Sequence, residues 1–425
     1  MTIITNIKAR EIIDSRGYPT LEAEIHLKNG TYAMASVPSG ASTGSLEACE
    51  LRDNNQQRFF GKGVLQAVKN VESKIKNKII GLDCSNFQEI DQIMIDLDNS
   101  NNKSNLGANA ILAVSLACAK AAAQYNNTPL FKFLTPKEKE FIMPTPMMNI
   151  INGGKHADNK IDIQEFMIMP VSATSIKDAI RTGAEIFQSL KALLKKDCYN
   201  TNVGDEGGFA PNISNASKAL DYICKATKIA GYEVGKDIFL ALDCASTEFY
   251  MYGKYHLEEK IINFEQLIQY YEDLVNNYPI FSIEDACAEK DYEGWKLITA
   301  KLGNKIQLVG DDLFVTNPQI LTQGIKDNIA NAILIKYNQI GTLSETLQTI
   351  NIAKQANYNN IISHRSGETE DATIAHIAVA TSAGQIKTGS LCRSDRCAKY
   401  NELIRIEEYL GKNSKYCGKT FSSNK

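Results

Sequence analysis

The sequence predicts an α/β protein in which a parallel β/α barrel follows a smaller α+β domain. Its 425 residues are too many for one small domain and suit a large domain with a smaller one. Prolines and polar residues cluster between residues 126 and 146 and divide the chain there. Beyond this division, short apolar runs alternate with longer helical patterns, as repeated βα units do. We therefore place the first domain at residues 1–134 and the barrel at residues 140–425.

The composition is that of an ordinary globular protein, with 44% hydrophobic and 22% charged residues. A formal net charge of −3 argues against a non-specific nucleic-acid binder, which needs a basic surface. The ten cysteines include no C-x-x-C pair, so reduced thiols in the cytosol fit better than a zinc site or a disulfide framework. Lys8, Arg10 and Glu11 precede any long apolar run, so we expect no signal peptide.

In the first domain, residues 1–60 predict short strands and turns. The segment LEAEIHL (21–27) alternates apolar and charged residues, as a half-exposed strand does. Helical patterns dominate from about residue 63 to residue 123. The Ala-rich run at 106–123 is interrupted by polar residues, which favours a buried helix over a membrane span.

In the second domain, six predicted strands each end in a charged or titratable residue. These residues, 23 to 41 positions apart, are Asp243, Glu284, Asp311, Lys336, His364 and Lys387. A strand, a helix and two loops need about that many residues. A parallel barrel gathers the C-terminal ends of its strands on the face where such barrels carry out chemistry. Any one of the six alone would be interpreted as a surface residue, but six in phase predict a converging site.

Three of these residues, Asp243, Glu284 and Asp311, are predicted to bring carboxylates together at neighbouring strand ends. Alone they would repel one another, and at least one would take up a proton. Oxygen ligands without histidine or cysteine point to a hard cation, magnesium before zinc. The alternative is that one or two of them pair with arginines or cap helices.

Lys336 follows the run AILI, so we expect its ammonium at the mouth of the barrel beside the metal. A lysine that is desolvated or close to cations has a lowered pKa and can act as a neutral base. The positive charges of Lys387 and of a metal ion would lower the pKa of Lys336 in this way. The alternative is a salt bridge between Lys336 and one of the carboxylates.

The segment SHRSGETED (363–371) contains a candidate anion clamp. Arg365 offers a planar fork suited to phosphate or carboxylate, and Ser366 adds a neutral donor. A solvated loop is the alternative interpretation. The small-residue loops 39–44 and 152–159 are segments that could fold over a ligand.

Two further acids stand in unusual settings. Glu165 lies in the apolar, strand-like run DIQEFMIMP, where an unpaired buried acid would be costly. Glu206 lies in VGDEGGFAP, where glycines let the backbone approach a ligand closely. A surface turn is the alternative for Glu206.

Taken together, the motifs resemble those of the enolase family, from about residue 3 to about residue 410. The N-terminal motifs are REIIDSRGYPT, SVPSGASTG, ELRD, GKGV and LGANAILAVSLA, and the C-terminal motifs are NGGKHADN, QEFMI, VGDEGGFAP, LVGDDLFVTN, IKYNQIGT, SHRSGETED, GQIKTG and AKYNELIRIEE. Each motif is short, but their order and spacing leave little room for another family. Tyr18 and Ala286 depart from the usual asparagine and proline, which bears on loop rigidity and the subunit interface rather than on chemistry.

The resemblance implies a (β/α)8-type barrel whose first units depart from strict alternation, beneath a small N-terminal domain. It implies the reversible dehydration of 2-phospho-D-glycerate to phosphoenolpyruvate and water, in glycolysis and gluconeogenesis. Such sites use a lysine or histidine base with one or two Mg²⁺ ions. Two Mg²⁺ ions are implied here, the second arriving with substrate.

The resemblance also assigns roles to particular residues. Asp243, Glu284 and Asp311 would hold the first Mg²⁺, and Ser39 would help to hold the second. Lys336 would take the C2 proton, and Glu206, with Glu165 beside it, would help to expel the C3 hydroxyl. The substrate would be bound by His156, Gln164, His364, Arg365, Ser366 and Lys387, with Arg365 and Ser366 on the phosphate.

A homodimer or octamer in the cytoplasm is implied as well, with a secondary presence at the cell surface, no membrane span and no need for nucleic acid. Two alternatives stay open. One is another reaction of the superfamily, in which a proton is taken from a different carboxylate substrate. The other is a scaffold or surface-binding relative with little catalysis. This alternative is disfavoured because Lys336, Glu206 and the metal ligands are all intact.

Overall fold

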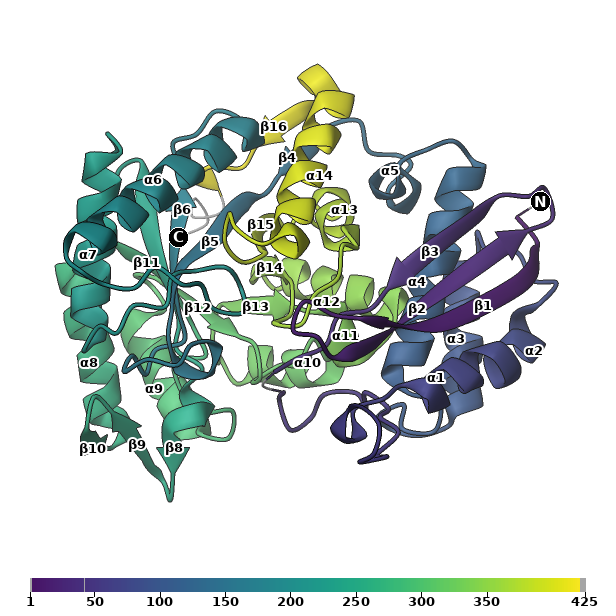
Figure 1. The fold of residues 1–425 in the computed structure, drawn as a ribbon, viewed down its shortest axis with the longest axis horizontal. Coiled ribbons are helices and arrows are strands. Elements are labelled where there is room, and N and C mark those ends of the chain that lie inside the picture. Colours follow the sequence, from purple (N-terminus) through teal and green to yellow (C-terminus); the bar gives the residue numbers. More distant parts are fainter. Residues whose placement is uncertain (1, 42, 421–425) are drawn as a thin grey trace.

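The computed structural model describes residues 2–41 and 43–420, and it divides into the two parts visible in Figure 1. A three-stranded antiparallel sheet with helices packed on it forms the N-terminal part, and a closed barrel ringed by helices forms the C-terminal part. This arrangement confirms the predicted fold class. Ser42, inside the predicted loop 39–44, lies outside the described residues.

The N-terminal sheet has β2 (Pro19–Leu27) between β1 (Ile4–Ile13) and β3 (Tyr32–Ser36). The predicted strand at 21–27 is confirmed, but it is more buried than its alternating pattern predicts. The reason is its central place in the sheet, because Arg10 of β1 donates hydrogen bonds to the side chains of both Glu22 and Glu24 and covers them.

Helices follow the sheet along the chain, as the pattern at 63–123 predicts. They are α1 (Leu65–Asn70), α2 (Lys76–Ile79), α3 (Phe87–Asp98), α4 (Ala108–Tyr125) and α5 (Leu130–Leu134). The Ala-rich run forms α4, which packs on β2 and β3 and is buried along most of its length, so the predicted buried helix is confirmed. Among the described residues, no helix combines the length and apolar character that a membrane crossing requires.

The barrel strands lie in the closed order β11-β12-β13-β14-β15-β5-β6-β7. Their bounds are β5 (Thr145–Asn152), β6 (Glu165–Pro170), β7 (Ile238–Asp243), β11 (Ile280–Glu284), β12 (Gln307–Gly310), β13 (Ala332–Ile335), β14 (Asn359–Ser363) and β15 (Gly384–Lys387). Runs such as AILI in β13 are apolar without alternation, because barrel strands are buried on both faces.

The barrel begins irregularly, as expected. β5 is followed directly by β6, which runs antiparallel to both β5 and β7, whereas the other neighbouring strands are parallel. The two helices α6 (Ile176–Lys196) and α7 (Ala216–Ile229) then precede β7. Because β6 is reversed, its first residues lie on the same face as the last residues of the parallel strands.

Helices after β7 cover the outside of the barrel (Figure 1). They are α8 (Phe264–Asn277), α9 (Tyr292–Leu302), α10 (Pro318–Lys326), α12 (Leu343–Gln355), α13 (Thr373–Ala380) and α14 (Ser394–Leu410). The single turn α11 (Tyr337–Ile340) instead packs against α4 of the N-terminal domain. Their starts follow from the sequence: Asn263 and Gln266 form a capping box on α8, and Asn317 caps α10 ahead of Pro318. The short strands β8 (Tyr250–Met251), β9 (Lys254–Leu257) and β10 (Lys260–Ile262) form a separate small sheet, and β4 (Phe141–Met143) pairs with β16 (Ser414–Tyr416).

Polar contacts hold the N-terminal domain against the barrel. Lys120 of α4 and the backbone N–H of Ser36 in β3 both donate to Asp371, between β14 and α13, at 2.5 and 3.2 Å. Lys103 forms an ion pair with Glu345 of α12 at 3.0 Å. These contacts place the segment after β3 beside the end of the barrel at which the parallel strands terminate.

Candidate active site

The six residues predicted to end barrel strands all lie at strand ends. Asp243, Glu284 and Lys387 are the last residues of β7, β11 and β15, and Asp311, Lys336 and His364 directly follow β12, β13 and β14. The predicted strand pattern is therefore confirmed. The rule behind it, that parallel strands present their C-terminal ends on one face, explains why these residues meet.

Glu165 reaches the same face by a different route. It is the first residue of the reversed strand β6, and it pairs in register with Asn152 at the end of β5 and Asp243 at the end of β7. Gln164 precedes it, and its backbone N–H donates to the carbonyl of Asp243. A rule based on the ends of parallel strands alone would have missed both residues.

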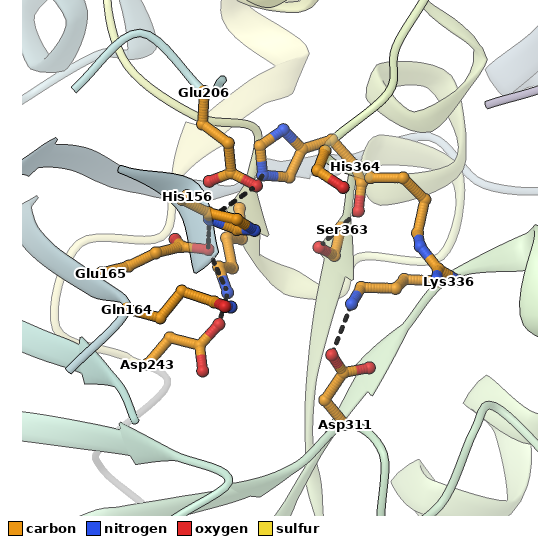
Figure 2. A pocket seen from close by; sticks show the side chains of 12 residues that line it. His156, Gln164, Glu165, Glu206, Asp243, Asp311, Lys336, Ser363 and His364 are labelled. Carbon is orange, nitrogen blue, oxygen red and sulfur yellow. Dashed lines mark hydrogen bonds and ion pairs between the residues drawn. The ribbon is translucent and has the colours of Figure 1, made fainter. Parts of the chain in front are cut away.

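These side chains line one small cavity of about 310 Å³ (Figure 2). Its lining is His156, Gln164, Glu165, Glu206, Asp243, Asp311, Lys336, Ser363, His364, Arg365, Ser366 and Lys387. Of these, Ser363 alone is absent from the predicted site. Glu284 lies outside the lining, with both its carboxylate oxygens 2.8 Å from Lys387 Nζ.

Ser39 is predicted in the site, but its hydroxyl is engaged elsewhere in this structure. The hydroxyl oxygen accepts from Arg52 at 2.8 Å, and the hydroxyl donates to Glu50 at 3.1 Å. Its backbone does reach the site, because Ser39 and Gly367 exchange N–H···O bonds of 2.8 and 2.9 Å. The backbone of Ser39 therefore lies beside the candidate anion clamp, while Ser39 also lines a neighbouring cavity.

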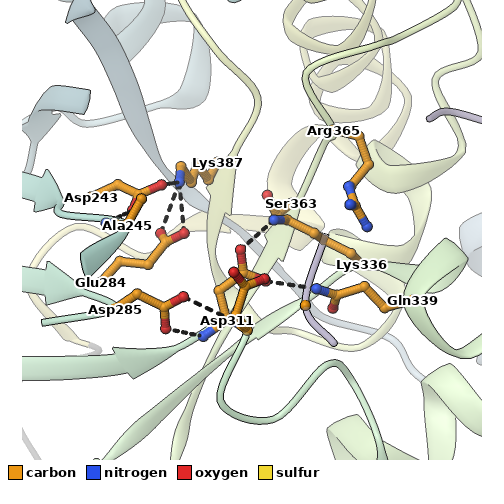
Figure 3. Close-up of polar contacts among 12 residues, drawn as sticks. Asp243, Ala245, Glu284, Asp285, Asp311, Lys336, Gln339, Ser363, Arg365 and Lys387 are labelled. Atoms are coloured by element: carbon orange, nitrogen blue, oxygen red, sulfur yellow. Dashed lines mark hydrogen bonds and ion pairs between the residues drawn. The ribbon is translucent and has the colours of Figure 1, made fainter. Parts of the chain in front are cut away.

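At one end of the cavity, Lys387 joins two carboxylates (Figure 3). Its Nζ lies 2.8 Å from Asp243 Oδ2 as well as 2.8 Å from Glu284. Burial alone would raise the pKa of Asp243, but the ammonium of Lys387 lowers it. Burial raises the pKa of Glu284 well above its usual range, and the charge of Asp243 adds to the effect. The cluster therefore holds more acid groups than one ammonium can neutralise.

Lys336 is paired with Asp311, and the pair changes the expected state of the lysine. Burial lowers the pKa of Lys336, but Asp311 opposes this effect, so the pKa stands above its ordinary value. The salt bridge that was the alternative to a neutral base is thus the arrangement seen here. Arg365 and Lys387 act the other way and lower the pKa of Lys336, so its charge depends mainly on Asp311.

Among the described residues, two groups bring three potential metal-ligand atoms within 4.8 Å of one another. They are His156, Glu165 and Glu206, and Asp285, Asp311 and Asp312. The predicted trio is not one of these compact groups, and its acids instead face the ammonium groups of Lys387 and Lys336. Its chemistry nevertheless fits magnesium, because the ligands are all carboxylates and the acids outnumber these two cations.

The pKa values of the neighbouring acids Glu165 and Glu206 are shifted in opposite directions. Burial raises the pKa of Glu165 well above its usual range, and the charge of Glu206 adds to this. Burial acts on Glu206 in the same direction, but His364 and His156 oppose it and hold the pKa of Glu206 well below its usual range. Asn149 also donates to Glu206 Oε2 at 3.1 Å. The surroundings therefore favour the protonated form of Glu165 and the ionised form of Glu206.

Arg396 is a functional candidate that the sequence reasoning missed. It is completely buried, and it contacts His364 Nδ1 and the carbonyl oxygens of Arg365 and Ser366. Because a guanidinium can only donate, His364 Nδ1 accepts, and its proton lies on Nε2, which faces Glu206 at 3.4 Å. Burial lowers the pKa of His364 to about 3. A charged residue at a helix start is usually a surface residue, so the sequence gives no sign of this role.

The two residues of the candidate anion clamp, Arg365 and Ser366, both have side-chain partners. Arg365 donates to Glu47 with two nitrogens, at 2.8 and 3.1 Å, and the Ser366 hydroxyl accepts the backbone N–H of Ala41 at 2.7 Å. Both clamp residues are buried and line the cavity. Glu47, the partner of Arg365, was not predicted.

Two family models match the chain, and together they cover nearly all of it. The model described as "Enolase, N-terminal domain" matches residues 4–134, and the model described as "Enolase, C-terminal TIM barrel domain" matches residues 140–425. The barrel model alone covers more than half of the chain.

Proposed function

The chain belongs to the enolase family, and on that premise we propose that it catalyses the reversible, magnesium-dependent dehydration of 2-phospho-D-glycerate to phosphoenolpyruvate and water. The observation that carries the proposal is the lining of one cavity, where a lysine, two acids and an arginine–serine pair face the same space. Together they are suited to take a proton from carbon, expel a hydroxyl group and hold a phosphate.

Magnesium would be held by Asp243, Glu284 and Asp311, and when bound it would supply positive charge against the dianion that forms as the proton leaves. The acid excess around Lys387 supports this assignment, since Glu284 resists ionisation without further positive charge nearby. Ser39 is proposed to help hold a second ion that arrives with substrate. For that role its hydroxyl must first leave Arg52 and Glu50.

Lys336 is proposed to take the proton from C2. It can do so only as a neutral amine, and its ion pair with Asp311 keeps it charged in the present arrangement. When Asp311 turns to another cation, the largest influence that raises the pKa of Lys336 is removed. Burial, Arg365 and Lys387 then lower that pKa, as a general base near neutral pH requires.

Glu165 and Glu206 are proposed to remove the C3 hydroxyl as water. The protonated form of Glu165, which burial favours, can give its proton to the hydroxyl as it leaves as water, and both acids are then ionised beside the ammonium of Lys387. His156 lies 3.6 Å from Glu165 and 3.7 Å from Glu206, which places it to orient the pair. Asn149 and His364 hold Glu206 in the same way.

The phosphate is proposed to bind Arg365 and Ser366, and the substrate carboxylate to lie near Lys387. Gln164, His156 and His364 line the same cavity and would complete the contacts to the substrate. All of these side chains are buried, so their hydrogen bonds to a bound anion would be shielded from water.

The direct test is an ultraviolet assay for phosphoenolpyruvate, with 2-phosphoglycerate as substrate. We expect turnover with Mg²⁺, its loss with EDTA and its return when Mg²⁺ is restored. Racemase or lactonising activity without turnover of 2-phosphoglycerate would contradict the proposal and favour a different carboxylate substrate. A well-folded protein that lacks every such activity would favour the scaffold alternative.

A further inference from the structure

Gln339 is a buried amide that lies beside Asp311 and Lys336 (Figure 3). It sits on the single turn α11, three residues after Lys336, and 1% of its surface is exposed. Its Nε2 donates to Asp311 Oδ1 at 2.8 Å and, over a longer 3.5 Å, to Glu47 Oε1. Its Oε1 accepts from the hydroxyl of Thr316 at 2.7 Å.

Thr316 decides which way this amide points. Its oxygen accepts the backbone N–H of Lys336 at 2.9 Å, and its single hydroxyl hydrogen is directed to Gln339 Oε1. The amide nitrogen must then face Asp311 and Glu47. A reversed amide would place an acceptor against two carboxylates, which accept only when ionised.

Both carboxylate oxygens of Asp311 accept hydrogen bonds from one short segment, residues 336–339. Gln339 donates to Oδ1, while Lys336 donates to Oδ2. The backbone N–H of Asp311 is held in turn by Asp285 at 2.9 Å. An amide cannot change its charge near neutral pH, so its hydrogen bond fixes the rotation of the carboxylate whatever the state of Lys336.

The other contact of the amide leads to the anion clamp. Glu47 Oε1, which Gln339 approaches, also accepts from Arg365 at 3.1 Å, and Glu47 Oε2 accepts from Arg365 at 2.8 Å. The Glu47 carboxylate is held further by the backbone N–H of Gly44 at 3.0 Å. One amide thus connects a candidate metal ligand with the partner of the candidate phosphate ligand.

We propose that Gln339 is a positioning residue, which sets the rotation of Asp311 at the metal end of the site and joins it to Glu47 at the anion end. The proposal rests on the proposed function, since it takes Asp311 as a magnesium ligand and Arg365 as the phosphate partner. Gln339 itself contacts neither ligand in this scheme. Its effect on the reaction passes through the two side chains that it holds.

The test is the variant Gln339→Met, which keeps a similar volume and removes the amide. Mg²⁺ titrated by calorimetry into the substrate-free protein should bind roughly ten- to a hundred-fold more weakly than to wild type, the usual effect of losing a residue that orients a metal ligand. Turnover of 2-phosphoglycerate should fall at low Mg²⁺ and return to most of the wild-type rate when Mg²⁺ is raised. The matched control is Gln348→Met, on an exposed position of α12, which should bind Mg²⁺ as wild type does.

Unchanged Mg²⁺ affinity in folded Gln339→Met would overturn the proposal, as would a loss of turnover that excess Mg²⁺ does not restore. If that variant does not fold, Thr316→Val removes the hydroxyl that orients the amide, and a smaller loss of Mg²⁺ affinity is expected. Wild-type affinity in Thr316→Val would then count against the proposal. Calorimetry on substrate-free protein separates the two proposals, because it reports on Gln339 even if wild type does not convert 2-phosphoglycerate.

Discussion

Lys336 shows how one neighbour can decide the chemistry of a residue. Its position after β13 is fixed by the strand, but its charge is fixed by Asp311, which comes from the end of another strand. Burial and the cations Arg365 and Lys387 lower its pKa, but Asp311, with a smaller contribution from Glu284, outweighs them and raises it. Lys336, the proposed base, and Asp311, the proposed metal ligand, are therefore the two partners of one ion pair.

We expect Lys336→Ala to abolish turnover, because no other side chain is proposed to take the C2 proton. A general base contributes about 10²- to 10⁴-fold to the rate, so a loss of at least this size is expected in the phosphoenolpyruvate assay. Mg²⁺ binding by calorimetry should persist, since Asp243, Glu284 and Asp311 remain. Lys326→Ala, on an exposed position of α10, serves as the control. Near-normal activity in Lys336→Ala would remove the base from the mechanism.

At the scale of elements, the reversed strand β6 and the glycine-rich loop before α7 bring the acid pair together. β6 delivers Glu165 from its first residue, and the loop delivers Glu206 from the other side. Gly207 makes the loop geometry feasible, because its φ is +86° and an added Cβ would lie 2.4 Å from the carbonyl oxygen of Cys392. The backbone N–H of Ser390 donates to the carbonyl of Glu206 at 2.8 Å and fixes the loop to the segment after β15.

We expect Gly207→Ala to lower both the melting temperature and kcat, since alanine would strain the backbone and displace the segment that holds Glu206. Gly231→Ala is the matched control, because Gly231 has a similar φ of +89° with nothing within 4 Å of an added Cβ. The control should lose about 1–2 kcal/mol through backbone strain alone. Equal stability losses in the two variants, with activity retained in both, would show that the contact with Cys392 is unimportant.

At the scale of the whole molecule, the N-terminal domain supplies residues that reach the barrel face. Glu47 pairs with Arg365, and the backbone of Ser39 pairs with Gly367. Lys120 and Ser36 hold the same region through Asp371, whose side chain is 3% exposed. The positions of Arg365 and Ser366, the candidate anion clamp, therefore depend on how the two domains dock.

The docking should weaken in acid. Burial would raise the pKa of Asp371, but Lys120, with the hydrogen bonds from Thr373, outweighs this effect and lowers the pKa from 3.8 to about 2. Because the folded pKa lies below the unfolded one, Asp371 stabilises the fold above about pH 4, and this contribution is lost as the pH falls toward 2. A difference of this size corresponds to about 2 kcal/mol.

We therefore expect Asp371→Asn to melt at a lower temperature than wild type at neutral pH, with the difference shrinking as the pH falls below 4. Melting followed by circular dichroism across this range gives the comparison. Asp96→Asn, on an exposed position of α3, should follow wild type throughout. A constant gap between Asp371→Asn and wild type at every pH would mean that the ion pair with Lys120 is not its source.

Much of this protein could be predicted from the order of residues alone. The barrel strands and their polar ends follow from the βα spacing, and so does the convergence of Asp243, Glu284, Asp311, Lys336 and Lys387, because parallel strands end on one face. The sequence also predicts the strands and helices of the N-terminal domain. The domain limits at 134 and 140 stay a prediction from the proline and polar cluster. The homodimer or octamer and the cytoplasmic location stay predictions from the family resemblance.

The tertiary structure alone decided how the charges pair. Arg396, Glu47 and Gln339 look like surface residues in the sequence, and each is a partner of a predicted site residue from a distant segment. It also decided that Lys336 is held by Asp311 and that the pKa of Glu165 is raised while that of Glu206 is lowered. The physical reason is that strand position follows from local pattern, whereas the pKa of a buried group depends on burial and on charges that only folding brings within a few ångströms.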